Sequence, residues 1–197
     1  FDRFLAEIPW GETEIRAAGL LEYECRRSGS EGSSFATIVA AGRNSSLPHA
    51  QTGTGILDRK ENLLIDFGVM LDSYCSDSTR MIVPPAQTEI RRIEEIVKEA
   101  QLNAIASVRP GCPAREIDAA ARRVIIDSGF GEAFGHSTGH GLGLEVHELP
   151  FISARSEEIL EEGMVFTVEP GIYLPGKFGV RLESTVQVTS SGCRIIG

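Results

Sequence analysis

The amino-acid sequence predicts an α+β domain in which a curved antiparallel sheet is backed by helices. Two pairs of strand-like runs, over 63–83 and 164–188, lie on either side of two amphipathic helical patterns, over 88–108 and 113–128. Strands, then helices, then strands is an order typical of α+β folds, whereas a parallel sheet needs strands and helices in alternation. The chain of 197 residues is long enough for one domain with a sizeable core.

The composition narrows the class of protein further. Hydrophobic residues make up 42% of the chain and charged residues 24%, as in an ordinary globular protein. The net charge of −9, with basic residues in short pairs only, argues against a nucleic-acid partner and against an anionic membrane surface. No apolar run approaches the ~18–20 residues that span a bilayer. The four cysteines are far apart and form no CxxC motif, so we expect reduced thiols in a cytoplasmic protein.

The first part of the chain predicts a helix, a strand and a loop. Thr13 is expected to be the N-cap of the helix, which stops near Ser28-Gly29. Its apolar positions recur at helical spacing and are Ile15, Ala18, Leu21 and Cys25. The apolar run Phe35–Ala41 predicts a buried strand, and the polar residues 42–55 predict a loop that contains Pro48-His49.

A first strand pair is predicted over Leu63–Asp66 and Asp77–Val83, with a turn near Leu71-Asp72. Thr88 is then expected to cap a long amphipathic helix that closes at Pro110-Gly111. This pair and this helix complete the first half of the α+β pattern.

The second half of the pattern begins with a helix over 113–128 that stops before Gly129. A second strand pair is predicted over Met164–Glu169 and Val180–Val188. The segment Pro175–Lys177 between them has the composition of a turn.

Three of the four histidines lie in the glycine-rich stretch Gly135–Glu148. Its four glycines disfavour a stable helix and allow the backbone to approach other groups closely. A single histidine in such a loop is usually solvated, but three within twelve positions indicate a metal site or an acid–base site. They are His136, His140 and His147.

Four carboxylates lie within or directly after the predicted strands, where an ionised side chain is costly to bury without a cation. Two of them, Asp66 and Glu169, end runs of apolar residues. If Asp66 faces Asp77, and Glu169 faces Glu183, each hairpin turns at a position where the sequence already favours a turn. Directly opposed residues lie only ~4.5–5.5 Å apart at Cβ, and opposed like charges repel.

Cations between the two pairs would remove this repulsion, and two divalent ions would neutralise four carboxylates. Carboxylate-rich sites with one imidazole suit Mn²⁺, Co²⁺, Fe²⁺ or Zn²⁺ better than soft metals. A pair of such ions can activate a water molecule and polarise a substrate carbonyl group. The sequence therefore predicts a hydrolytic site with two divalent metal ions.

The sequence blocks that carry these residues resemble those of the pita-bread metallopeptidases, and they occur in the same order. The blocks are LIDFG, SDSTR, GHSTGHGLGLEVHE, TVEPGIY and GVRLES. Over about 35–188 the chain is most similar to the branch of Xaa-Pro dipeptidase (prolidase) and aminopeptidase P. The resemblance implies a pita-bread fold with pseudo-twofold halves.

By this resemblance, five residues would bind two metal ions. They are Asp66, Asp77, His140, Glu169 and Glu183. Asp77 and Glu183 would bridge the two ions, and Glu169 would also handle the proton of the attacking water. Mn²⁺ or Co²⁺ is the expected metal, with Zn²⁺ and Fe²⁺ as alternatives.

Four further residues would act on the substrate or on the ligands. His49 matches a histidine near the substrate carbonyl group. His136 and His147 match two histidines that flank the proline-recognising site and help to stabilise the tetrahedral intermediate. Arg181 matches an arginine that orients a bridging carboxylate.

The implied activity is that of a dinuclear-metal exopeptidase that cleaves between an N-terminal residue and proline, in dipeptides or longer peptides. Methionine aminopeptidase shares the five ligands, but His136, four residues before His140, favours the proline branch. A catalytically silent pita-bread module that binds partners is a third interpretation. Because the chain opens at Phe1 inside a helical pattern, we expect residues 1–197 to be one catalytic domain of a longer chain. Its N-terminal domain would be missing, and the full-length protein would be a homodimer.

Two further motifs in the sequence are incomplete. Gly135–Gly139 fits the G-x-S-x-G nucleophile elbow, but the glycines that follow disfavour the helix that this motif requires. Gly171–Lys177 resembles a phosphate-binding loop, but Phe178 replaces the serine or threonine that would hold Mg²⁺. Neither a serine hydrolase nor a nucleotide-binding protein is therefore predicted.

Overall fold

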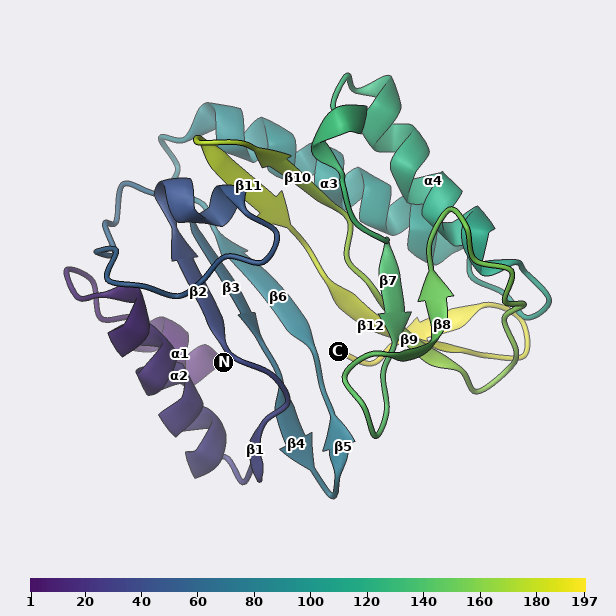
Figure 1. Ribbon diagram of the computed structural model, residues 1–197, viewed down its shortest axis with the longest axis horizontal. Coiled ribbons are helices and arrows are strands. Elements are labelled where there is room, and N and C mark those ends of the chain that lie inside the picture. The colour runs from purple at the N-terminus through teal and green to yellow at the C-terminus, as the bar shows by residue number, and fades with distance from the viewer.

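The computed structural model describes residues 1–197, and every strand pair in it is antiparallel (Figure 1). The first half of the chain contains two helices and six strands. The helices are α1 (Asp2–Ala6) and α2 (Glu14–Arg27), and the strands are β1 (Gly32–Ser33), β2 (Ile38–Ala41), β3 (Leu63–Phe67), β4 (Val69–Leu71), β5 (Tyr74–Cys75) and β6 (Ser78–Ile82). A short 3-10 helix, η1 (Gly42–Ser46), follows β2.

The second half contains two amphipathic helices, a short 3-10 helix and seven strands. The helices are α3 (Thr88–Ser107), α4 (Ala114–Asp127) and the short 3-10 helix η2 (Gly131–Ala133). The strands are β7 (Gly139–Gly141), β8 (Glu148–Ile152), β9 (Val165–Val168), β10 (Gly171–Leu174), β11 (Phe178–Arg181), β12 (Ser184–Val188) and β13 (Cys193–Ile195).

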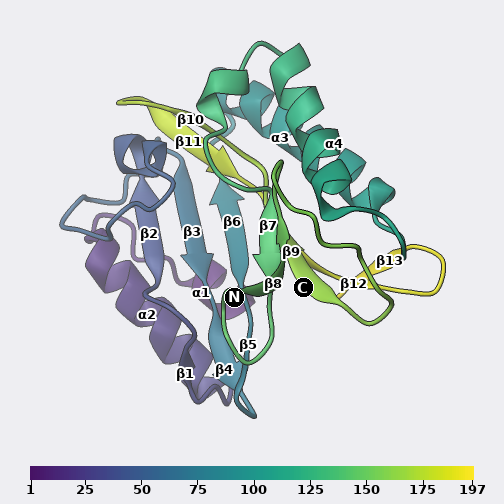
Figure 2. The ribbon, with the colours of Figure 1, turned by 45° about the vertical axis from the view of Figure 1, so that its right-hand side comes forward.

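The strands form small sheets that lie side by side in one curved layer (Figures 1 and 2). The two main sheets have the strand orders β2-β3-β6 and β13-β12-β9-β7-β8, and β6 contacts both β11 and β12. Helices α1 and α2 cover the first sheet, and α3 and α4 cover the second (Figure 1). Each half therefore has a sheet with its own helical cover, which confirms the predicted α+β architecture.

The helices begin close to the predicted positions, with two differences. The Thr13 hydroxyl caps α2 by accepting a hydrogen bond from the Arg16 amide at 3.3 Å, as predicted. Thr88, in contrast, is the first residue of α3 and not its cap, because Gln87 holds the N-cap position without a side-chain bond. Ile15 was predicted to be a core position of α2, but its side chain is 53% exposed, and the core face of this helix includes Ala17 instead.

The first strand pair differs from the prediction in its register. Asp66 is paired with Thr79 and not with Asp77, so the hairpin turns one residue later than expected, at Asp72 and Ser73. Both turn residues adopt a left-handed backbone, with φ values of 51° and 67°. Since side chains alternate along a strand, Asp77 still points to the same face as Thr79, diagonally opposite Asp66.

The second strand pair has the predicted register, although each long strand is divided into two. Strands β9 and β12 pair Val168 with Ser184, and β10 and β11 pair Gly171 with Arg181. This register places Glu169 opposite Glu183 in the short gap between the two ladders. The turn lies at Gly176, whose φ of 72° is favourable for glycine. The strand predicted over 35–41 is also shorter than expected and covers only β2.

No helix in the structure combines the length and the hydrophobicity required to cross a membrane. All four cysteines are free thiols. Burial raises the pKa of Cys25 and of Cys193, which disfavours their reactive thiolate forms.

Glu14, at the start of α2, is 1% exposed, and its carboxylate holds the loop that follows β2 through hydrogen bonds. Its carboxylate accepts hydrogen bonds from the Ala41 amide at 2.8 Å, and from the Asn44 side chain and the Gly53 amide at 2.9 Å each. These contacts hold both ends of the segment that carries His49. This role could not be predicted from the sequence, because Glu14 has the usual position of an acid in a first helical turn.

Replacing Glu14 with glutamine is expected to lower the free energy of unfolding by about 2–3 kcal/mol, because one acceptor oxygen becomes a donor that faces N–H groups. Urea denaturation followed by circular dichroism measures this change. Glu12→Gln is the matched control, since the Glu12 side chain is 47% exposed and should tolerate the change. Equal stability of the two variants would contradict the role of Glu14.

Candidate metal centre and active site

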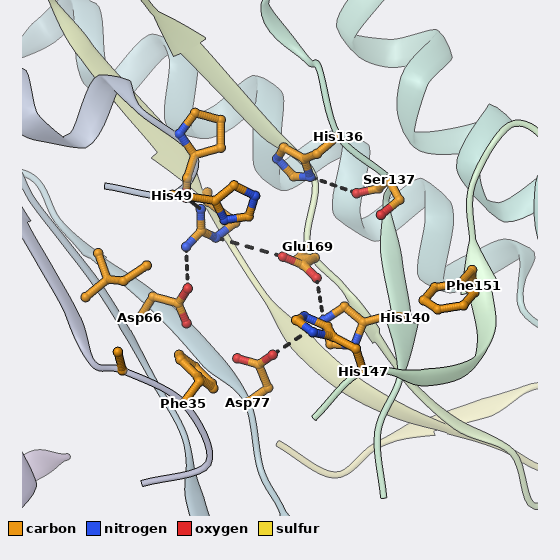
Figure 3. A pocket seen from close by; sticks show the side chains of 14 residues that line it. Phe35, His49, Asp66, Asp77, His136, Ser137, His140, His147, Phe151 and Glu169 are labelled. Atoms are coloured by element: carbon orange, nitrogen blue, oxygen red, sulfur yellow. Dashed lines mark hydrogen bonds and ion pairs between the residues drawn. The ribbon is translucent and has the colours of Figure 1, made fainter. Parts of the chain in front are cut away.

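All four histidines of the chain meet in one cavity of about 410 Å³ between the two halves of the fold (Figure 3). The ionisable groups that line it are His49, Asp66, Asp77, His136, His140, His147, Glu169 and Arg181. Glu183 is the one predicted site residue that does not line the cavity. It lies directly behind the wall, in contact with the other carboxylates.

Three carboxylates form a cluster at the base of this cavity. One oxygen each from Asp66, Asp77 and Glu183 lies within 4.8 Å of the others. Asp66 Oδ1, Asp77 Oδ1 and Glu183 Oε1 are buried and have no hydrogen-bond partner. Buried carboxylate oxygens without donors are costly, and they are the ligands that hard divalent cations prefer. The residues at this position therefore fit a metal centre.

His140 and Glu169 adjoin the cluster from the second half of the fold (Figure 3). His140 Nε2 lies 3.2 Å from Glu169 Oε1 and 3.5 Å from Asp77 Oδ2. The other ring nitrogen, Nδ1, is 3.0 Å from the Gly141 carbonyl oxygen, which fixes the proton on Nδ1. A histidine whose Nδ1 is held in this way points its Nε2 toward the carboxylates, and Nε2 is the atom that a metal ion among them would bind.

The pKa values of these groups show how strongly negative charge is concentrated here. Burial raises the pKa of Asp66 to about 7, and burial together with neighbouring carboxylates raises that of Glu183 well above its ordinary value. Burial alone would lower the pKa of His140, but its bonds to Asp77 and Glu169 outweigh this effect and raise the pKa to about 10. Four carboxyl groups, those of Asp66, Asp77, Glu169 and Glu183, therefore share this site with two basic side chains, Arg181 and His140.

Arg181 is the buried cation of the site, with 3% of its surface exposed. Its Nη2 donates to Asp66 Oδ2 at 2.5 Å, and its Nε donates to Thr79 Oγ1 at 2.9 Å. The Thr79 hydroxyl in turn donates to Glu183 Oε2 at 2.9 Å. Arg181 thus orients Asp66 directly and reaches Glu183 only through Thr79.

A family model described as "Metallopeptidase family M24" matches residues 1–190 of the chain. The chain belongs to this family. It is 44% identical over 191 residues to an Xaa-Pro dipeptidase of Pyrococcus horikoshii, a match that covers 96% of this chain and 54% of that protein. This M24 chain therefore spans about half the length of the relatives that it matches.

Solved structures agree with this assignment and confirm the pita-bread fold. An X-Pro aminopeptidase from Thermotoga maritima superposes with a TM-score of 0.94 at 45% identity, over 98% of this chain and 55% of that one. A prolidase from Pyrococcus furiosus superposes with a TM-score of 0.94 at 43% identity, over 98% and 57% of the respective chains.

Glycines in the M24 chain allow the strand that carries His140 to fit tightly between its neighbours. A Cβ atom at Gly139 would overlap the Thr167 carbonyl oxygen, and one at Gly141 would overlap that of Leu149. Any other residue at these positions would push β7 away from β8 or β9. Two of the four glycines of the histidine-rich stretch therefore serve the close approach that the sequence predicted.

Tyr173 is a site residue that the sequence analysis missed. Its hydroxyl accepts a hydrogen bond from Arg181 Nη1 at 2.8 Å and lies 3.1 Å from His136 Nε2. The other nitrogen of His136 bonds the Ser137 carbonyl oxygen at 2.8 Å. Both ring nitrogens of His136 are therefore engaged by the protein, and the Ser137 hydroxyl has no histidine base, which removes the nucleophile-elbow interpretation.

Replacing Tyr173 with phenylalanine is expected to lower kcat/KM for peptide hydrolysis by about tenfold, because His136 and Arg181 lose their shared partner. Steady-state kinetics of the metal-loaded protein measures this effect. Tyr23→Phe is the control, because Tyr23 is 59% exposed and remote from the cavity. Unchanged kinetics in Tyr173→Phe would show that the hydroxyl does not position the site.

Helix α4 holds the segment that leads into β7 from outside the cavity. Asp118 is fully buried and accepts hydrogen bonds from Arg122 Nε and Nη2, at 2.9 Å each, and from the Thr138 hydroxyl at 2.8 Å. Arg122 also donates to the carbonyl oxygens of Phe134 and His136 at 2.9 Å each. The sequence showed only two ordinary helical residues, one turn apart, at these positions.

Proposed function

We propose that residues 1–197 form the catalytic domain of a dinuclear-metal exopeptidase that hydrolyses the bond between an N-terminal residue and proline. The observation that carries this proposal is the cluster of three carboxylates beside His140 and Glu169, each of which has one buried oxygen without a hydrogen-bond partner. The metals are proposed to be Mn²⁺ or Co²⁺, with Zn²⁺ or Fe²⁺ as alternatives, since oxygen ligands with one imidazole suit these ions.

Asp66, Asp77, His140, Glu169 and Glu183 would hold the two ions. When bound, the ions would activate a water molecule and polarise the scissile carbonyl group. Glu169 would take the proton of the attacking water and deliver it to the departing proline nitrogen. His49 and His147, whose rings line the same cavity, would donate hydrogen bonds to the oxygen that gains negative charge.

Arg181 and His136 would orient other groups in this mechanism and would not transfer protons. Arg181 keeps Asp66 oriented, and its four hydrogen bonds leave it no role in proton transfer. His136, with both nitrogens engaged, would present the face and edge of its ring to the proline side of the substrate.

The assignment to proline substrates draws on the matched relatives, which are named Xaa-Pro dipeptidase and X-Pro aminopeptidase. We propose that this chain acts on proline-containing dipeptides or peptides, in the cytoplasm, within a homodimer of a longer protein. The net charge of −9 is consistent with the absence of a nucleic-acid partner.

Hydrolysis of Ala-Pro substrates compared with Met-Ala-Ser, in the presence of Mn²⁺ or Co²⁺, tests the proposal. Faster turnover of the proline substrates is expected, whereas a clear preference for Met-Ala-Ser would indicate a methionine aminopeptidase. Metal analysis of the purified protein is the second measurement. A protein that retains no divalent ion after metal is added back would be a silent binding module and not an enzyme.

A further inference from the structure

Thr167 is fully buried in β9 and does not line the cavity, yet its side chain joins two of the proposed metal ligands. Its hydroxyl accepts a hydrogen bond from the His140 amide at 3.1 Å and donates one to Glu169 Oε1 at 3.0 Å. An amide N–H only donates, and an ionised carboxylate only accepts. The two bonds therefore run in one direction, from the His140 backbone through Thr167 to the Glu169 carboxylate.

The pairing of β7 with β9 shows why a side chain makes this connection. The register of the two strands places His140 directly opposite Thr167. Backbone hydrogen bonds join the strands two residues before and two residues after His140, at 2.8 and 3.3 Å. At His140 itself, the amide bonds the Thr167 hydroxyl, while the Thr167 carbonyl oxygen lies against Gly139. The hydroxyl thus takes the place of a carbonyl oxygen as the acceptor in the ladder.

The same register brings three side chains to one face of the sheet. Directly opposed residues share a face, and so do residues two apart on one strand, so His140, Thr167 and Glu169 all lie on the cavity side. Glu169 Oε1 also lies 3.2 Å from His140 Nε2 (Figure 3). The contacts therefore form a closed loop, from the His140 backbone through Thr167 and Glu169 to the His140 ring. Glu169 Oε2 remains on the side of Arg181 Nε, at 3.9 Å.

We propose that Thr167 is a positioning residue, whose hydroxyl holds the Glu169 carboxylate and the His140 backbone in the relative arrangement that metal binding requires. The proposal rests on the proposed ligand set of the exopeptidase. Because Thr167 does not reach the cavity, it acts only through these two ligands. Partners that hold metal ligands by hydrogen bonds typically change metal affinity by about 10–100-fold when they are lost.

Four side chains at position 167 separate the hydroxyl from the space that it fills. Threonine and serine carry the hydroxyl, whereas valine has the shape of threonine without it, and alanine is serine without it. Calorimetric titration of the chelator-treated full chain with Mn²⁺ measures the affinity. Thr167→Val and Thr167→Ala are expected to bind Mn²⁺ about tenfold more weakly than the unmodified protein, and Thr167→Ser is expected to retain the affinity.

An affinity that follows size would overturn the proposal, with valine equal to threonine and alanine equal to serine. If Thr167→Val does not fold, the serine and alanine variants still decide between the hydroxyl and the packing. Thr185→Val is the matched control, because Thr185 is directly opposite Thr167 in β12, is 5% exposed, and bonds neither ligand through its hydroxyl. It should bind Mn²⁺ as the unmodified protein does, and a loss equal to that of Thr167→Val would contradict a specific role of Thr167.

Steady-state kinetics at saturating Mn²⁺ provides a second measurement. Thr167→Val is expected to lower kcat by about tenfold and to leave KM unchanged, since Glu169 would handle the proton of the attacking water and Thr167 does not touch the substrate. Thr167→Ser should retain kcat. A raised KM with an unchanged kcat would contradict the proposal.

Failure of the proposed function can be recognised separately, because the unmodified protein would then bind no Mn²⁺ or cleave no proline peptide. The role of Thr167 is still tested in that case by hydrogen exchange of the His140 amide, followed by NMR in the chelator-treated full chain. This amide is expected to exchange at least about tenfold faster in Thr167→Val and Thr167→Ala, which lack its acceptor, than in Thr167→Ser. Equal exchange in all these variants and in the unmodified protein would overturn the proposal.

Discussion

Replacing Asp77 with alanine is expected to abolish metal binding and to lower peptide hydrolysis by more than about a hundredfold. Asp77 is 9% exposed, and its carboxylate lies in the cluster with Asp66 and Glu183 and 3.5 Å from His140 Nε2. As a proposed metal ligand, Asp77 would contribute to the affinity for the ions, so that its loss would weaken their binding. The metal content of the purified variant and its kcat/KM with an Ala-Pro substrate are the two measurements.

Thermal denaturation separates the metal-binding role of Asp77 from a role in folding. Added Mn²⁺ should raise the melting temperature of the unmodified protein, because a ligand that binds only the native state stabilises it. The Asp77→Ala variant should show no such increase. Without metal it should be at least as stable as the unmodified protein, since one of several repelling carboxylates is gone.

Glu99→Ala is the matched control for the charge change, because Glu99 is exposed on α3, away from the cavity. It should keep the metal content, the activity and the response to Mn²⁺. An Asp77→Ala protein that retains two metal ions and full activity would overturn the proposed ligand set.

The two hairpins show how far register can be predicted from the sequence. The register of the second hairpin was predicted correctly because its strands are symmetric about Gly176, where glycine adopts a positive φ without strain. The register of the first hairpin differs from the prediction because its turn lies at Asp72 and Ser73. Neither residue is glycine, yet both adopt left-handed backbone conformations. The face of the sheet on which each carboxylate lies was nevertheless predicted correctly. The shift moved the partner of Asp66 by two residues, and side chains alternate between the two faces along a strand.

The residues of the site that could be predicted are those whose side chains are unusual in their local context. A carboxylate that ends an apolar strand, such as Asp66, is one example. Thr79 and Tyr173 could not be predicted, because a threonine or a tyrosine in a strand is ordinary. Their partners are also remote in the sequence, 104 residues from Thr79 to Glu183 and 37 from His136 to Tyr173.

Replacing Asp118 with alanine is expected to lower the free energy of unfolding by about 3–5 kcal/mol, because breaking a buried ion pair leaves an uncompensated charge. Asp118 is fully buried, and the side chain of its partner Arg122 is 25% exposed. In a protein of this length, such a loss lowers the melting temperature by roughly 10 °C. Thermal and urea denaturation both measure the effect.

The same helix provides a matched control in Asp127→Ala. Asp127 pairs with Arg123 at the same i,i+4 spacing, but these side chains are 65% and 79% exposed. An exposed pair contributes only about 0.5 kcal/mol, so this variant should be nearly as stable as the unmodified protein. Equal losses in the two variants would contradict the structural role of Asp118.

The Asp118 variant should also lose activity, because Arg122 holds the backbone on both sides of the segment that carries His136. Changing Arg122 to methionine as well removes the uncompensated charge and should restore part of the stability. It should not restore activity, since replacing Arg122 removes the donor to the carbonyl oxygens of Phe134 and His136. Recovery of stability without recovery of kcat/KM would separate the two roles of α4, as a buried ion pair in the core and as a support for the catalytic segment.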